Sequence, residues 1–134
     1  MSLVVIAGEC RTEELLNGLS IIKAPDAFID CPSAAVILGN GSRPEIRSAL
    51  GVIVDGDDPD AHLPRSVQLI TCGVSPKNTV CITSRTPEKL TLSLNRSIRT
   101  ASGVCEPLEL PVDFRGSFSE YELMAAFAAR LLLK

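Results

Sequence analysis

The sequence lacks the features that would tie the protein to a membrane or to nucleic acid. It contains no run of about 20 apolar residues, the length that a membrane-spanning helix needs. Its opening residues form too short an apolar stretch, without a basic lead, for a secretory signal. The net charge is −3 and the basic side chains are scattered, whereas nucleic acid requires clustered cations. We therefore expect no membrane or nucleic-acid partner and a cytoplasmic location.

Metal-binding patterns are also missing. The chain has five cysteines, none in a CxxC spacing, and its one histidine, His62, cannot complete a common zinc set. We interpret the cysteines as free and reduced, mostly in the core, and His62 as a residue of a surface loop. Cys10 is the exception. It lies just before a predicted helix, whose N-terminus would lower the pKa of its thiol.

The length and composition predict one domain that covers residues 1–134. Domains usually hold about 100–150 residues. Hydrophobic residues make up 46% of the chain and charged residues 22%, so there is enough apolar material for a core.

The first half of the chain alternates continuously apolar segments with connectors. Strands are predicted at residues 3–7, 34–38, 52–54 and 67–71, with a short one at Ile21 and Ile22. Such strands are typical of a parallel sheet that is covered on both faces.

Two capping signals predict helices between these strands. Thr12 is expected to cap a short helix that ends at Gly18. Ser42, with Glu45 three residues later, has the spacing of a capping box and predicts a helix to about Leu50.

The second half alternates apolar and polar residues. Segments 79–84 and 90–98 predict an antiparallel hairpin, and residues 108–112 add a strand. Ser119 is expected to cap a final helix, residues 120–133, whose apolar girth predicts burial and self-association or a protein partner. The expected fold class is a three-layer, Rossmann-like α/β domain with a mostly parallel sheet and a small antiparallel extension.

The order of motifs over roughly residues 34–134 resembles the central domain of the Mur ligases. That family makes an acyl phosphate from ATP and couples an amine to it. The segments that carry the resemblance are Ala34–Asn40, Gly51–Pro59 with Asp55-Gly56-Asp57-Asp58-Pro59, Val67–Gly73, Leu110-Pro111-Val112 and Gly116–Ala126. The resemblance implies a Mur-ligase central-domain-like fold.

The departures from the family pattern imply that ligase activity is lost. The chain has no Gly-x-x-Gly-Lys-(Ser/Thr) loop to hold a triphosphate, and its Gly39–Arg43 segment is too short and has no lysine. The family's Asp-His pair is absent, Asp55 replaces its adenine-side asparagine, and Phe118-Ser119 replaces its His-Asn pair. We expect a non-catalytic, Mur-ligase-like binding or protein-interaction module that does not hydrolyse ATP.

Two loops are the candidates for a ligand site. Asp55, Asp57 and Asp58 follow one predicted parallel strand, and Gly39-Asn40-Gly41 follows another. Open parallel sheets bind ligands at such strand ends. The candidate cofactors are Mg²⁺, which carboxylates could hold, and an adenine nucleotide. The alternative for the aspartates is that they cap the turn through backbone N–H groups, and for the glycines a plain turn.

An enzymatic alternative rests on the same aspartates. Four apolar residues followed by Asp-x-Asp resemble the haloacid-dehalogenase phosphatases, with Asp55 as nucleophile and Asp57 as general acid in Mg²⁺-dependent phosphoryl transfer. Asp58-Pro59 departs from that pattern, and no downstream lysine is evident. No serine or cysteine has an identifiable base, so we assign no catalytic residue.

Overall fold

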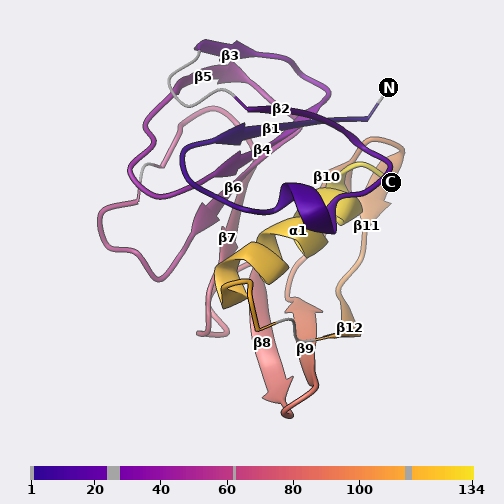
Figure 1. Cartoon of the computed structure of the whole chain (residues 1–134). Helices are drawn as coiled ribbons and strands as arrows, with labels where there is room; N and C mark the ends of the chain where they lie inside the picture. Colours follow the sequence, from indigo (N-terminus) through magenta and orange to yellow (C-terminus); the bar gives the residue numbers. More distant parts are fainter. Residues whose placement is uncertain (1, 24–27, 62, 114–115) are drawn as a thin grey trace.

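The computed structural model describes residues 2–23, 28–61, 63–113 and 116–134 (Figure 1). His62, the predicted surface-loop residue, lies outside them. The described elements are β1 (Leu3–Ala7), η1 (a 3₁₀ turn, Glu13–Leu15), β2 (Ser20–Lys23), β3 (Phe28–Asp30), β4 (Ala34–Leu38), β5 (Glu45–Ser48), β6 (Gly51–Asp55), β7 (Leu69–Cys72), β8 (Val80–Arg85), β9 (Lys89–Leu94), β10 (Ile98–Thr100), β11 (Gly103–Cys105), β12 (Leu108–Asp113) and α1 (Glu120–Leu132).

Eight of these strands form one large sheet, in the order β12-β9-β8-β7-β6-β4-β1-β2. The six strands β2, β1, β4, β6, β7 and β8 run parallel, and β9 and β12 are antiparallel to their neighbours. The contact between β7 and β8 is narrow, because only Cys72 and Val80 pair across it. Thr71 and Thr79 reinforce this seam: the Thr79 N–H donates to the Thr71 hydroxyl at 3.0 Å. The sheet therefore consists of a parallel part and an antiparallel part.

A second, two-stranded sheet covers one face of the parallel part. The chain passes from β3 into β4 and from β5 into β6, while β3 pairs with β5 and β4 with β6, both in parallel. Two successive coils of chain therefore stack on one another, as in a β-solenoid. Ile29 and Ile46 point from this small sheet into an apolar cluster with Val36 and Val54 of the large sheet.

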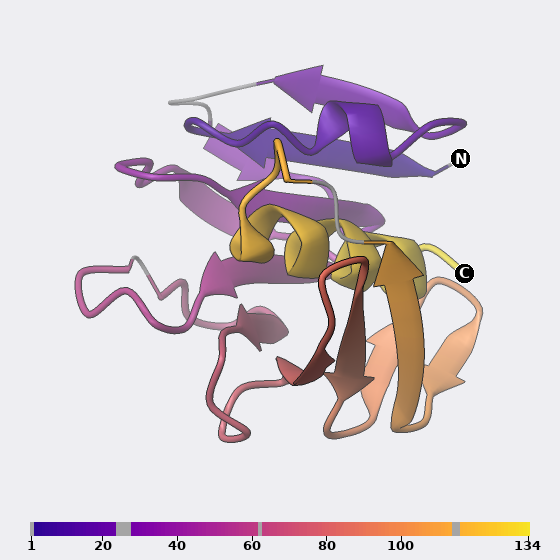
Figure 2. The same ribbon diagram turned by 60° about the horizontal axis from the view of Figure 1, so that its bottom comes forward.

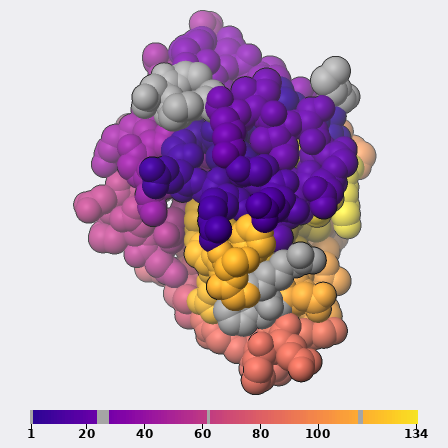
Figure 3. Space-filling model, viewed as in Figure 1, coloured from indigo at the N-terminus to yellow at the C-terminus, as the bar shows by residue number. Residues whose placement is uncertain are grey.

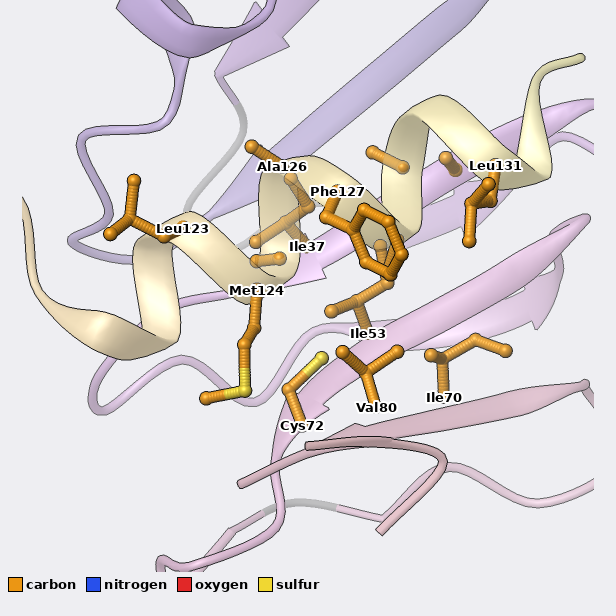
Figure 4. Close-up of a cluster of buried hydrophobic side chains, with 14 of the residues drawn as sticks. Ile37, Ile53, Ile70, Cys72, Val80, Leu123, Met124, Ala126, Phe127 and Leu131 are labelled. Atoms are coloured by element: carbon orange, nitrogen blue, oxygen red, sulfur yellow. The ribbon is translucent and has the colours of Figure 1, made fainter. Parts of the chain in front are cut away.

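Helix α1 covers the opposite face (Figures 1 and 2). Met124 and Phe127 lie over Ile53 and Cys72 in a large core that continues into the antiparallel part (Figure 4). The helix begins as predicted: the Ser119 hydroxyl accepts the Glu122 N–H, and the Glu122 carboxylate accepts the Ser119 N–H.

The predicted three-layer α/β class is wrong. The molecule is mostly β, with 44% of its residues in strands and 13% in helix, and α1 is the one α-helix of the described residues. It is therefore neither Rossmann-like nor like a Mur ligase central domain. The error lies in the connectors. Continuously apolar strands require cover on both faces, but they do not specify that helices supply it.

Both connector helices predicted in the first half are absent. The segment expected to be a helix from Ser42 to Leu50 contains strand β5, whose residues alternate between exposed and half-buried positions. Ile46 is its inward-facing residue, so pairing with β3 buries the apolar side chain that a helix would have buried. The helix expected after Thr12 is only the single turn η1, and the Thr12 side chain makes no capping bond.

The terminal helix is buried, as its apolar girth predicted, and self-association or a protein partner stays a prediction. Nine residues of α1 are buried, including Leu123 and Leu132, so the chain itself covers the apolar girth of the helix. Figure 3 shows the surface of the terminal segment between the N-terminal residues and the hairpin β8–β9. Within the residues described, no helix combines the length and apolar character needed to cross a membrane.

The packing of α1 predicts a large cost for truncating Met124, which is 2% exposed. We expect Met124→Ala to lower the free energy of unfolding by about 2–5 kcal/mol, because it leaves a cavity between helix and sheet. Val104, which is 63% exposed on β11, is the control. Val104→Ala should change stability by less than about 0.5 kcal/mol. Urea unfolding of both variants measures this, and equal effects would contradict the assigned core.

Candidate functional site

A pocket lies where β4 and β6 separate at their carboxyl ends. Their pairing ends at Ile37 and Ile53, and beyond it each strand runs into a loop. The pocket has a volume of about 150 Å³. Its lining comes from residues 38–43 after β4 and from Val54, Asp55, Asp58, Asp60 and Ala61 after β6. Five of the six predicted ligand residues, Gly39, Asn40, Gly41, Asp55 and Asp58, therefore line one pocket.

The glycine loop is held in place by the chain that follows β1. Asn40 forms an antiparallel bridge with Glu9, and the Gly39 N–H donates to the Ala7 carbonyl at 2.6 Å. A Cβ on Gly39 would lie 2.5 Å from the Glu9 carbonyl oxygen, so only glycine permits this approach. Gly41 has a φ of +75°, which makes the turn that the plain-turn interpretation predicted. This loop forms one wall of the pocket.

The aspartates build their own turns. The Asp55 carboxylate Oδ1 accepts the Asp57 N–H at 3.0 Å, and the Asp58 Oδ1 accepts the Asp60 N–H at 2.9 Å. Both contacts are the local turn-capping bonds that the alternative interpretation predicted. Each uses one carboxylate oxygen. Among the described residues, no hydrogen bond occupies Oδ2 of Asp55 or Asp58, so those atoms remain able to accept one from a ligand.

Asp57 does not belong to the pocket. Its Oδ2 accepts the Val74 N–H at 2.8 Å, and its Oδ1 packs so closely on Gly73 that a Cβ there would lie 2.5 Å away. Asp57 thus fixes the loop after β7. The two aspartates of the proposed phosphoryl-transfer pair, Asp55 and Asp57, therefore face different parts of the structure.

The electrostatics of the pocket are set by Asp55 and Arg43. Partial burial raises the pKa of the Asp55 carboxyl, and the charges of Asp57 and Asp58 raise it further, against the lowering effect of the Asp57 N–H. Arg43 supplies a guanidinium, which donates to the Asp60 carbonyl at 3.0 Å and so bridges the two loops. Three carboxylates and one guanidinium line the pocket, which gives it an excess of negative charge.

Sequence reasoning missed Arg43, Asp60 and Tyr121 as parts of this region. Arg43 and Asp60 stand next to the predicted segments and could have been included by proximity. Tyr121 gives no local signal. Its hydroxyl lies 2.7 Å from the Leu38 carbonyl and 3.2 Å from that of Ile53, at the point where the strands separate. It connects α1 to the base of the site, and burial raises the pKa of its phenol.

The expectation for Cys10 is wrong. Burial raises the pKa of its thiol to about 11, and the negative charges of Glu122 and Glu13 add to this effect. The following helix is a single 3₁₀ turn, too short to lower the pKa. The Cys10 thiol is thus a buried core group that favours its neutral form.

Over the part of the chain that the structure describes, no group of three or more His, Cys, Asp or Glu side chains is arranged to hold a metal ion. No protein-family model, curated protein or solved structure matches the chain.

The close contact between Gly39 and Glu9 predicts that a methyl group at position 39 is costly. We expect Gly39→Ala to lower the free energy of unfolding by about 1–3 kcal/mol, because two backbone segments must move apart. A Cβ added at Gly116 would meet nothing within 4 Å, so Gly116→Ala is the matched control. Thermal and urea unfolding measure both. A Gly39→Ala variant as stable as the control would show that the loop wall is loose.

The raised pKa of Asp55 predicts that replacing its charge with a neutral group stabilises the fold, by an amount that depends on pH. The folded state penalises the charged carboxylate. This penalty is absent below the pKa of the unfolded state, which is about 3.9. It grows as the pH rises from the unfolded pKa to the folded pKa, and it is complete above the folded pKa. Asp55→Asn keeps an oxygen that can accept the Asp57 N–H. Its stability relative to the wild type should therefore increase from about pH 3.5 to about pH 7.

Urea unfolding at several pH values measures this difference, with Asp113→Asn on exposed β12 as the control. A difference between Asp55→Asn and wild type that stays constant with pH would show that Asp55 is not desolvated.

Proposed function

We propose that the protein is a non-catalytic binding module whose ligand site is the pocket between the 39–43 and 55–61 loops. The observation that carries this proposal is the meeting of two chain segments, each predicted from its own sequence, in one pocket at the carboxyl ends of β4 and β6. Crevices at the carboxyl ends of parallel strands are where open sheets bind ligands.

The size and charge of the pocket support a small ligand that carries hydrogen-bond donors or a positive charge. Its volume of about 150 Å³ is below the roughly 300–1,000 Å³ of pockets that enclose drug-sized ligands. Asp55 and Asp58 present carboxylate oxygens, which accept hydrogen bonds and attract cations. A protonated amine with a neighbouring hydroxyl has the chemistry and the size that this lining favours.

The same features do not favour an adenine nucleotide. Its phosphates would face an excess of carboxylates, and the one guanidinium, from Arg43, already bonds the Asp60 carbonyl. Gly39 packs directly on the backbone of Glu9, so the backbone of Gly39 is closed to a phosphate on that side. The orientation of Asp57 toward Val74 likewise gives no support to phosphoryl transfer by an Asp55–Asp57 pair.

The cysteines bear on where the module works. All five are free, and Cys31 and Cys105 are partly exposed. Thiols that reach the surface persist in reducing compartments, which supports the proposal of a cytoplasmic location.

Amide chemical shifts of ¹⁵N-labelled protein provide the test. Ethanolamine, Mg²⁺ and ADP are titrated separately. We expect ethanolamine to shift the amides of Asn40, Gly41, Arg43 and Asp58, and ADP to leave them unchanged. Asp55→Asn should weaken ethanolamine binding about tenfold, or about 1.4 kcal/mol, because it removes a charge and keeps the turn.

Asp113→Asn is again the matched control and should bind as the wild type does. Shifts confined to other parts of the molecule would refute the site. ATP or phosphomonoester hydrolysis that requires Mg²⁺ and disappears in Asp55→Asn would establish the enzymatic alternative and refute a non-catalytic role.

A further inference from the structure

Two Asn-Gly pairs occur in the sequence, Asn17-Gly18 and Asn40-Gly41. In such a pair the backbone nitrogen of the glycine can attack the side-chain amide of the asparagine, because both groups belong to one chain and a five-membered ring forms. Glycine has no Cβ to hinder the approach. In the folded protein, the reaction depends on what surrounds each pair.

Asn17 and Gly18 are the central residues of an exposed turn between η1 and β2. The Leu19 N–H donates to the Leu16 carbonyl at 3.2 Å, and Gly18 has a φ of +88°, as in a type II turn. Among the described residues, none accepts the Gly18 N–H. Apart from its chain neighbours, no atom lies within 4 Å of a Cβ placed on Gly18. The nitrogen of Gly18 is therefore accessible to water and to the Asn17 side chain.

A cation is bonded to the peptide group that contains this nitrogen. The loop lies beside α1 (Figure 1), and the guanidinium of Arg130 donates to the Asn17 carbonyl at 3.2 Å and to the Leu15 carbonyl at 2.9 Å. The Asn17 carbonyl and the Gly18 N–H form one peptide group. A positive charge at its oxygen stabilises the anion that forms when the N–H loses its proton. Arg130 therefore activates the Gly18 nitrogen as a nucleophile.

The surroundings of the other pair oppose the same reaction. Asn40 is held in an antiparallel bridge with Glu9, and it lines the pocket that has an excess of carboxylates. Negative charge disfavours a backbone anion. The related Asp55-Gly56 pair is blocked for another reason, because the Gly56 N–H donates to the Cys72 carbonyl at 2.8 Å. The structure thus separates pairs that are alike in sequence.

We propose that Asn17 is a site of spontaneous covalent modification, at which Arg130 promotes conversion of the asparagine to aspartate and isoaspartate. The Gly18 N–H gives its proton to hydroxide, and the nitrogen forms a bond to the Asn17 Cγ. The bond between Cγ and Nδ2 breaks, and the amide nitrogen takes up a proton and leaves as ammonia. The product of this step is a cyclic succinimide.

Water then opens the succinimide ring of residue 17. Hydrolysis of the bond from the nitrogen to Cγ gives aspartate, and hydrolysis of the bond to the backbone carbonyl carbon gives isoaspartate, whose chain runs through Cβ and Cγ. The net reaction consumes one water and releases one ammonia, and water is the only co-reactant.

The modification changes the contact between this loop and α1. Isoaspartate adds one carbon to the backbone between Leu16, which is fully buried, and Gly18. Because Leu16 is fixed in the core, we expect the carbonyl of residue 17 to shift relative to Arg130 and their hydrogen bond to weaken. This inference does not depend on the proposed ligand pocket.

Incubation of the folded chain in mildly alkaline buffer, followed by peptide mapping with mass spectrometry, tests the proposal. We expect the mass gain of an amide-to-acid conversion at Asn17, at least about fivefold faster than at Asn40, from the combined effect of charge and backbone restraint. The chain unfolded in urea is the reference, in which the two pairs should convert at similar rates. Asn17→Gln should remove the signal. Equal rates at the two pairs in the folded protein overturn the proposal.

Arg130→Gln tests the role of the guanidinium. It should slow the conversion of Asn17 about two- to fivefold, the effect of one exposed charge contact, and Arg130→Lys, which keeps a cation, should restore part of the rate. Arg96 donates to the Lys77 carbonyl at 2.7 Å, so Arg96→Gln is the matched control and should convert as the wild type does. Urea unfolding confirms that each variant is folded. An Arg130→Gln variant that converts as fast as the wild type, or faster, overturns the promotion by Arg130.

Discussion

The large sheet has apolar side chains on both faces, and the need to cover both faces governs the rest of the structure. Val36 and Val54 point to one side of the parallel strands, and Ile37 and Ile53 point to the other. Burial of such residues is the main favourable term in folding, so a bare face would be costly. Helix α1 covers one face and the β3–β5 sheet covers the other. The C-terminal helix is therefore essential to a fold that is otherwise built of strands.

This constraint also positions the site. Strands β4 and β6 remain paired only as far as Ile37 and Ile53, and the Tyr121 hydroxyl, which comes from α1, bonds the chain where they separate. The connector 39–50 must leave the large sheet, cross to β5 and return. Its first residues turn tightly against Glu9 and form the wall that faces Asp55 and Asp58. The pocket is thus a consequence of how the coils are connected.

The strands were predictable because their patterns are local. Ala34–Leu38 is apolar and buried at every position, and the three leucines of the alternating segment 90–94 are all buried, although Ser93 between them is buried too. The capping box at Ser119 and Glu122 was equally local. The β3–β5 sheet, which covers the face opposite α1, was not predictable. Segment 45–48 is too short to show a period, and its partner β3 lies on the far side of β4 in the chain, with Ile29 opposite Ile46. The pairing of two such segments is a tertiary effect that overrode the Ser42 helix signal.

The narrow seam between β7 and β8 has a consequence for cooperativity. One residue pair and the Thr71–Thr79 contact join the backbone of the parallel strands to that of the hairpin. Hydrogen bonding therefore divides the sheet into two blocks, each with its own ladder. The core beneath α1 includes Ile53 from one block and Leu92 from the other. We therefore expect the helix, more than the sheet, to couple the unfolding of the two blocks.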